Sequence, residues 1–106
     1  MAEKVLELTN GEFDKFIKEG TALVDFSAEW CMPCLMMAPI LEDLSERFSG
    51  KIKFGKIDVD SNREIAQKFQ VSSIPNLILF KKGKPVERFV GLTNAEDLEE
   101  KLKVFI

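Results

Sequence analysis

The chain has 106 residues, a length that predicts one domain able to bury a hydrophobic core without crosslinks or metal ions. Its net charge of −3 leaves no excess of positive charge to neutralise phosphates, which argues against a nucleic-acid-binding protein. No apolar run is long enough to span a membrane, and residues 1–4 lack the basic and apolar regions of a signal peptide. We therefore expect a single domain over residues 1–106, located in the cytoplasm, with no nucleic-acid or membrane partner.

The amino-terminal half of the chain alternates between strand and helix patterns. Residues 5–8 predict a short strand, and residues 21–26 are almost continuously apolar, which predicts a central strand covered on both faces. Between them, apolar side chains at helical spacing predict a helix that ends at Gly20. The longest helix is predicted from about Met32 to Phe48, because apolar residues recur there with a helical period.

The carboxy-terminal half predicts a further strand and helix, a hairpin and a final helix. Residues 53–59 form the strand, and cap residues at 60–62 start the helix that follows. Two strands at 76–80 and 86–90 are joined by residues 81–85, whose length and Gly-Pro content fit an antiparallel hairpin. A helix with acidic residues on its solvent face completes the order βαβαβαββα.

This order of elements predicts an α/β fold. Helices between the early strands imply right-handed parallel crossovers, whereas the hairpin adds an antiparallel pair. We therefore expect a three-layer α/β/α domain around a central mixed five-stranded sheet.

Both cysteines of the chain lie in the segment Trp30-Cys31-Met32-Pro33-Cys34, where the second strand passes into the longest helix. A closed zinc site takes four Cys or His ligands, but the chain has two cysteines and no histidine, so zinc would require a second chain or carboxylates. A structural crosslink across so short a loop would restrict the unfolded chain very little. The spacing therefore predicts redox chemistry and no metal, with a metal site shared between chains and two inert thiols as the remaining alternatives.

The start of a helix gives the two sulfurs different expected roles. Unpaired backbone N–H groups and the positive end of the helix dipole favour a thiolate at Cys31, which predicts Cys31 as the nucleophile. Cys34 lies nearly one turn later on the same helix face, where it can attack a mixed disulfide and resolve it. Pro33 fits the first turn of the helix, where it removes no hydrogen bond.

Seven short segments, spread over essentially the whole chain, carry a resemblance to a known family. They are Leu23-Val24-Asp25-Phe26, Ala28-Glu29-Trp30-Cys31, Pro33-Cys34, Ala38-Pro39-Ile40-Leu41, Lys56-Ile57-Asp58-Val59-Asp60, Ile74-Pro75 and Val90-Gly91. In these segments and in its order of elements, the chain resembles the thioredoxin family. The resemblance implies a thioredoxin fold and a protein-disulfide reductase that cycles between a Cys31–Cys34 disulfide and the dithiol, with no bound cofactor. It also implies two kinds of partner, oxidised protein substrates and a flavin-dependent or ferredoxin-linked thioredoxin reductase, and we expect a monomer.

Asp25 is a carboxylate inside an otherwise apolar strand, where it loses hydration unless it is paired or neutralised. One interpretation is a buried aspartate satisfied by nearby donors. The resemblance implies instead that Asp25 lies behind the cysteines and helps to remove the proton from Cys34, with Lys56 on the neighbouring strand as its charge partner. Burial would raise the pKa of the Asp25 carboxyl, and Lys56 would oppose that shift.

The resemblance also implies a substrate-binding surface around the cysteines. Ile74-Pro75 is similar to the family's cis-proline loop, in which Ile74 would offer backbone hydrogen bonds to an extended substrate segment. The residues expected to contact substrate are Trp30, Met32, Pro33, Ile74, Pro75, Gly91 and Leu92. The alternative for each of them is an ordinary core residue.

Three residues depart from the family pattern. Met32 stands where glycine is common, Ser27 where bacterial members often have a second tryptophan, and Leu35 where a lysine commonly follows the second cysteine. None of them removes a reacting group, but residues between the cysteines tune the reduction potential, and a lysine at position 35 would favour a thiolate. A second function class stays open, in which the chain is a binding subunit that uses the same fold without cycling its thiols.

Overall fold

The computed structural model describes residues 5–106, which form a five-stranded sheet and four helices. The strands are β1 (Val5–Leu8), β2 (Thr21–Ser27), β3 (Lys53–Asp58), β4 (Asn76–Lys81) and β5 (Lys84–Val90). The helices are α1 (Asn10–Lys18), α2 (Met32–Arg47), α3 (Arg63–Lys68) and α4 (Ala95–Lys103). The element order is the predicted one. None of the helices in this described range is long and apolar enough to cross a membrane.

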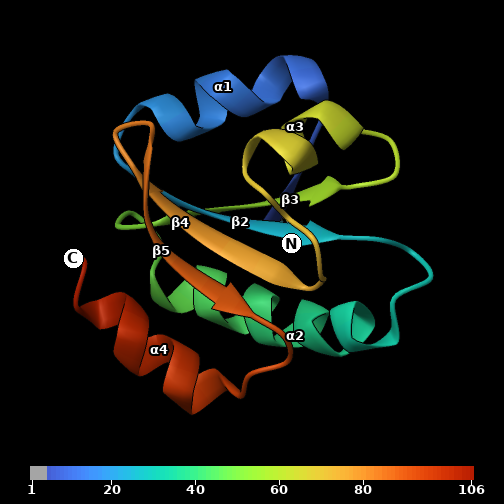
Figure 1. Ribbon diagram of the computed structural model, residues 1–106. Helices are drawn as coiled ribbons and strands as arrows, with labels where there is room; N and C mark the ends of the chain where they lie inside the picture. Colours follow the sequence, from blue (N-terminus) through green and yellow to red (C-terminus); the bar gives the residue numbers. More distant parts are fainter. Residues whose placement is uncertain (1–4) are drawn as a thin grey trace.

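The sheet is mixed, with the strand order β1-β3-β2-β4-β5. Strands β1 and β2 run parallel to β3, whereas β4 runs antiparallel to β2, and β5 runs antiparallel to β4. Helices α1 and α3 cover one face of the sheet, and α2 and α4 cover the other (Figure 1). The predicted three-layer α/β/α fold is therefore confirmed, with β2 at the centre of the sheet.

Strand β2 contributes to a separate hydrophobic core on each face of the sheet. Leu23 belongs to the core beneath α2 and α4, whereas Val24 and Phe26 belong to the core beneath α1 and α3. All three are at most 1% exposed, which explains why the strand reads as a continuous apolar run. Because side chains alternate along a strand, Asp25 lies on the same face as Leu23, toward α2.

The hairpin between β4 and β5 is tighter than predicted. The structure extends β4 to Lys81 and begins β5 at Lys84, so the connection is Lys82 and Gly83 and not the five residues 81–85. Both residues have a positive φ, 52° and 86°, as in the two-residue turns that match the twist of paired strands. Pro85 lies within β5, an edge strand of the sheet, where proline is tolerated.

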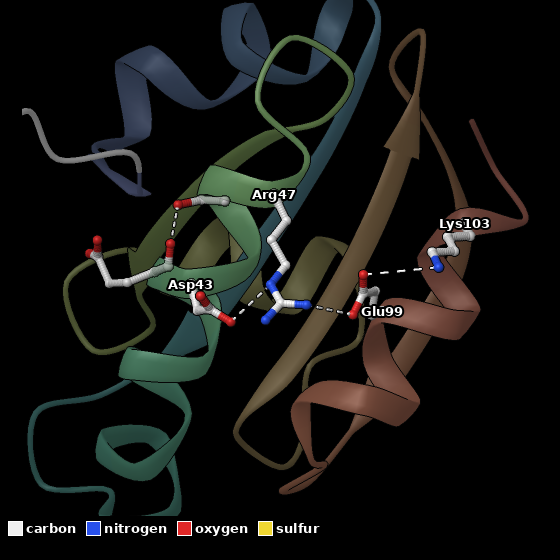
Figure 2. Close-up of polar contacts among 6 residues, drawn as sticks. Asp43, Arg47, Glu99 and Lys103 are labelled. Carbon is white, nitrogen blue, oxygen red and sulfur yellow. Dashed lines mark hydrogen bonds and ion pairs between the residues drawn. The ribbon is translucent and has the colours of Figure 1, made fainter.

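Helices α2 and α4 are linked on their outer surface by a small group of ion pairs (Figure 2). Arg47 contacts Asp43 at 3.2 Å and Glu99 at 3.1 Å, and Lys103 lies 4.0 Å from Glu99. Exposed pairs of this kind contribute about 0–1 kcal/mol each. Arg47 lies in the last turn of α2, at the opposite end of the helix from the cysteines.

Candidate active site

The two cysteines lie where the chain leaves the carboxyl end of β2 and enters α2. The backbone N–H of Cys31 donates to the carbonyl of Ala28 at 3.2 Å, which turns the chain between the two elements. Cys31 is the residue that caps α2, and Pro33 lies in the first turn. The predicted position of the pair, at the start of the longest helix, is confirmed.

A disulfide joins Cys31 to Cys34, with a Cα–Cα separation of 5.2 Å. The backbone N–H of Cys34 donates to the sulfur of Cys31 at 3.2 Å, so this sulfur takes the place that a side-chain oxygen has in an ordinary helix cap. The residues are 4% and 5% exposed, and Met32 and Pro33 between them are exposed. A sulfur that accepts an N–H at the positive end of a helix dipole is stabilised as a thiolate when the disulfide opens.

Asp25 is 2% exposed and lies on the face of β2 that α2 covers. Within residues 5–106 its Oδ1 atom has no hydrogen-bond partner, so the structure provides no donor that would satisfy this oxygen. Burial raises the pKa of the Asp25 carboxyl to about 7, and the positive charge of Lys56 opposes that shift. A carboxyl with such a pKa changes its charge near neutral pH and can therefore accept or release a proton there.

Strand register brings Lys56 beside Asp25. Lys56 on β3 pairs with Asp25 on β2 and with Glu7 on β1, so the three side chains form a row on one face of the sheet. Lys56 and Glu7 also line a cavity of about 310 Å³ that reaches Cys34. Ser27, which stands where bacterial members often have tryptophan, lines the same cavity. The cavity therefore connects Cys34 with the neighbourhood of Lys56.

The peptide bond between Ile74 and Pro75 is cis, as the resemblance implied. Ile74 packs against the buried cluster that contains both cysteines, so this loop faces the disulfide. The backbone N–H of Gly91 donates to the carbonyl of Pro75 at 2.8 Å, which places Gly91 beside the loop. Residues from two distant parts of the chain thus meet at the cysteine pair.

The exposure of the expected contact residues differs from one to another. Trp30 is 71% exposed, Met32 66% and Leu92 50%, so none of these three is a core residue. Pro33 is exposed, Ile74 and Gly91 are partly buried, and Pro75 is buried. Trp30 and Met32 therefore present exposed apolar side chains on either side of Cys31 in the sequence.

Sequence reasoning missed the residue that holds Trp30. The indole Nε1–H of Trp30 donates to Oδ2 of Asp60 at 2.7 Å, across a gap of 30 positions in the sequence. Residues 60–62 were predicted to cap the next helix, and Asn62 occupies that cap, but no contact of Asp60 with Trp30 was predicted. The aspartate instead fixes the orientation of an exposed aromatic ring beside the cysteines, and no local pattern in the sequence signals such a contact.

Comparison with known proteins agrees with this geometry. The family model described as Thioredoxin matches residues 4–104. A thioredoxin of Staphylococcus haemolyticus is 48% identical over 98 residues, which cover 92% of this chain and 94% of that protein. Thioredoxin of Staphylococcus aureus is 46% identical over the same shares of the two chains. These matches and the disulfide at the start of α2 show that the chain belongs to the thioredoxin family and is a thiol–disulfide oxidoreductase, a protein-disulfide reductase whose redox-active disulfide joins Cys31 to Cys34.

Proposed function

We propose that Cys31 attacks the disulfides of oxidised protein substrates and that Cys34 resolves the resulting intermediate. The observation that carries the proposal is the hydrogen bond from the Cys34 N–H to the Cys31 sulfur at the start of α2. Together with the helix dipole, this N–H stabilises negative charge on Cys31 and makes it the better nucleophile of the two. Cys34 lies inside the helix and lacks that position.

The reaction proceeds in two exchanges. In the reduced protein, the Cys31 thiolate attacks one sulfur of the substrate disulfide, so that the substrate S–S bond breaks, a mixed disulfide forms and one substrate thiolate leaves. Cys34 then loses its proton and attacks the Cys31 sulfur, which breaks the mixed disulfide and releases the second substrate thiolate. Two electrons have moved to the substrate, and the protein is left with the Cys31–Cys34 disulfide.

Asp25 is proposed to take the proton from Cys34 before the second exchange. This role is supported by the burial of Asp25 on the α2 side of the sheet and by a pKa of about 7 for its carboxyl. Lys56 is proposed to keep part of the Asp25 population ionised, since its positive charge lowers the pKa that burial raises. An ionised Asp25 is the form that can accept the proton.

The substrate is proposed to dock as an extended segment along the loop that carries Ile74 and Pro75. The packing of Ile74 against the cysteine cluster and the bond between Gly91 and Pro75 support this position. Backbone hydrogen bonds to Ile74 would hold the segment, as strand addition does at other sheet edges. The surrounding contacts are proposed to come from Trp30, Met32, Pro33, Gly91 and Leu92.

Membership of the family implies a thioredoxin reductase and disulfide-bonded substrates as partners. The reductase is proposed to be flavin-dependent or ferredoxin-linked, and the protein to act as a monomer in the cytoplasm. Residues 1–106 are proposed to be one domain, because the two cores lie on the two faces of one sheet and share β2.

The assignment of the two cysteines is tested by trapping. When reduced Cys34→Ser is mixed with an oxidised protein substrate, we expect a covalent adduct through Cys31 to accumulate, because the second exchange is blocked. Mass spectrometry of the adduct after proteolysis identifies the cysteine involved. The matched Cys31→Ser variant is expected to form little adduct, and an adduct that forms faster at Cys34 in that variant would reverse the roles.

The same pair of variants tests the alternative of a binding subunit. A disulfide reductase loses multiple-turnover reduction of the substrate in both variants, since neither can form the internal disulfide. A protein that only binds would show no turnover in the wild type either, and both variants would keep its affinity for the partner.

A further inference from the structure

Arg88 on β5 contacts both ends of the segment that connects α3 with β4. Its Nη2 atom donates to the carbonyl of Phe69, the residue that ends α3, at 2.6 Å. Its Nη1 atom donates to Oδ1 of Asn76, the first residue of β4, at 3.3 Å. One guanidinium therefore joins the beginning and the end of residues 70–75, which include the cis bond between Ile74 and Pro75.

Asn76 continues this contact into the segment itself. Its side chain is buried, and its Nδ2 atom donates to the carbonyl of Ser73 at 3.4 Å. Asn76 is also held in the sheet between Phe26 on β2 and Val90 on β5. The side chain that accepts from Arg88 thus binds the residue directly before Ile74.

The end of α3 leaves the Phe69 carbonyl free for Arg88. The N–H groups of Gln70 and Val71 donate to the carbonyls of Gln67 and Ala66 at 3.0 Å and 2.8 Å, a pattern that closes the helix by a turn through a left-handed residue. Gln70 supplies that turn with a φ of 58°, which is unfavourable for a residue with a side chain. A contact from outside the helix therefore helps to fix the direction in which the segment leaves α3.

We propose that Arg88, acting through Asn76 and Phe69, is a positioning residue that holds residues 70–75 in place for docking of protein substrates. The inference rests on the proposed docking of an extended segment at Ile74. In a protein substrate, the polypeptide segment around the disulfide pairs with this loop, whereas a small disulfide has no such segment and needs only access to Cys31. Arg88 therefore favours the reduction of protein disulfides over that of small ones.

This role depends on the paired N–H donors of the planar guanidinium, its fork, and not on the positive charge alone. Two N–H groups of fixed geometry reach two acceptors, the backbone carbonyl of Phe69 and the side-chain oxygen of Asn76, which the single ammonium of lysine does not reproduce. Arg88→Lys keeps the charge and loses the fork, and Arg88→Met loses both. Because Arg88 is exposed, neither substitution disturbs the core.

The test compares two substrates and includes a matched control. We expect Arg88→Lys and Arg88→Met to reduce the disulfides of insulin about three- to tenfold more slowly, the effect of losing one or two hydrogen bonds. The rate with hydroxyethyl disulfide should stay that of the wild type. Arg47→Lys makes the same chemical change at the far end of α2 and should alter neither rate.

The position of the loop is measured separately from the chemistry. NMR order parameters of the backbone amides in residues 70–74 should fall in both Arg88 variants and stay unchanged in Arg47→Lys. Order parameters that stay at the wild-type level in Arg88→Lys would overturn the inference. Full insulin activity in Arg88→Lys together with reduced activity in Arg88→Met would also overturn it, because that result would assign the effect to the positive charge. An equal fall in the rates with insulin and with hydroxyethyl disulfide would also overturn the inference, because it would show that the substitution affects the cysteines themselves.

The two proposals fail in different ways. If the loop loosens but insulin is reduced at the wild-type rate, substrate docking at Ile74 is wrong, and so is the role of Arg88 in it. The order of attack by Cys31 and Cys34 is unaffected by that result, because the trapped adduct of Cys34→Ser reports on it independently.

Discussion

Two effects of Asp25 can be separated by experiment: the proposed transfer of a proton to its carboxyl group, and the free-energy cost of burying the charged form of that group. The carboxyl lies on the α2 side of β2 with one oxygen that has no hydrogen-bond partner within residues 5–106. Its pKa of about 7 lets it exist in both charge states near neutral pH. In the proposed reaction, proton transfer to Asp25 belongs to the second exchange, since the helix start stabilises the Cys31 thiolate without a base.

At the level of this residue we predict that Asp25→Asn slows the second exchange much more than the first. A positioned base contributes roughly a hundredfold or more to a proton-transfer step, and the amide of asparagine cannot replace it. Rapid acid quenching of the reaction with an oxidised protein measures the rise and decay of the mixed disulfide. In the wild type the decay should accelerate as the pH rises through about 7, the pKa of Asp25, and Asp25→Asn should lose this dependence.

Asp43→Asn is the matched control, because Asp43 lies on α2 and pairs with Arg47 on the surface. It should leave both exchanges unchanged. Equal slowing of both exchanges by Asp25→Asn would contradict a role in proton removal from Cys34.

Among the elements, α1 packs so closely on β1 and β3 that one position in β3 has no room for a side chain. A Cβ atom at Gly55 would lie 2.8 Å from Cδ1 of Leu8 and 2.9 Å from the ring of Phe16. Leu8 is buried in the core beneath α1, so these atoms have little freedom to move. The fit between α1 and the sheet therefore depends on a glycine at position 55.

We predict that Gly55→Ala destabilises the fold by about 1–3 kcal/mol, the usual cost of overpacking a core. Urea unfolding of the variant and the wild type measures the difference. Gly11→Ala is the matched control, since Gly11 lies in α1 with nothing within 4 Å of an added Cβ, and alanine there favours the helix. A Gly55→Ala protein as stable as the wild type would show that α1 shifts at no cost.

For the molecule as a whole, Asp25 makes stability depend on pH in the direction opposite to that of an ordinary paired carboxylate. Its pKa is raised from 3.8 to about 7 on folding, so the folded protein holds a proton that the unfolded chain has already lost between these values. The free energy of unfolding contributed by this group therefore falls as the pH rises from about 4 to about 7. A shift of about three pH units corresponds to about 4 kcal/mol.

We predict that Asp25→Asn is more stable than the wild type at about pH 8, by up to about 4 kcal/mol, and by a smaller margin of about 1.6 kcal/mol at about pH 5, where the unfolded chain has already lost this proton. Asparagine does not ionise, so it removes the cost of the buried charge, while the other carboxyl groups cancel in the comparison. Urea unfolding of both oxidised proteins at the two pH values measures the difference. A gain in stability that is equal at both values would contradict ionisation as its cause.

Much of the fold was predictable because its signals are local. The apolar run of β2, the helical period of α2 and the cap residues before α3 each lie within one element, and they gave the right order and layers. The hairpin length was wrong because a two-residue turn is set by the positive φ of Lys82 and Gly83, and lysine carries no signal for that conformation. At the site, the cysteines were found from their spacing, whereas the contact of Asp60 with Trp30 was not predicted.

By itself the sequence determined the redox pair, its place at a helix start and the buried carboxylate in the strand before it, because each depends on neighbours within a few positions. Tertiary structure alone decided which groups meet there. Lys56 lies between Asp25 and Glu7 because β3 lies between β2 and β1, Trp30 meets Asp60, and Arg88 reaches both ends of the loop at Ile74. These contacts join residues from separate elements, so strand order and register fix them, and no periodicity along the chain contains that information.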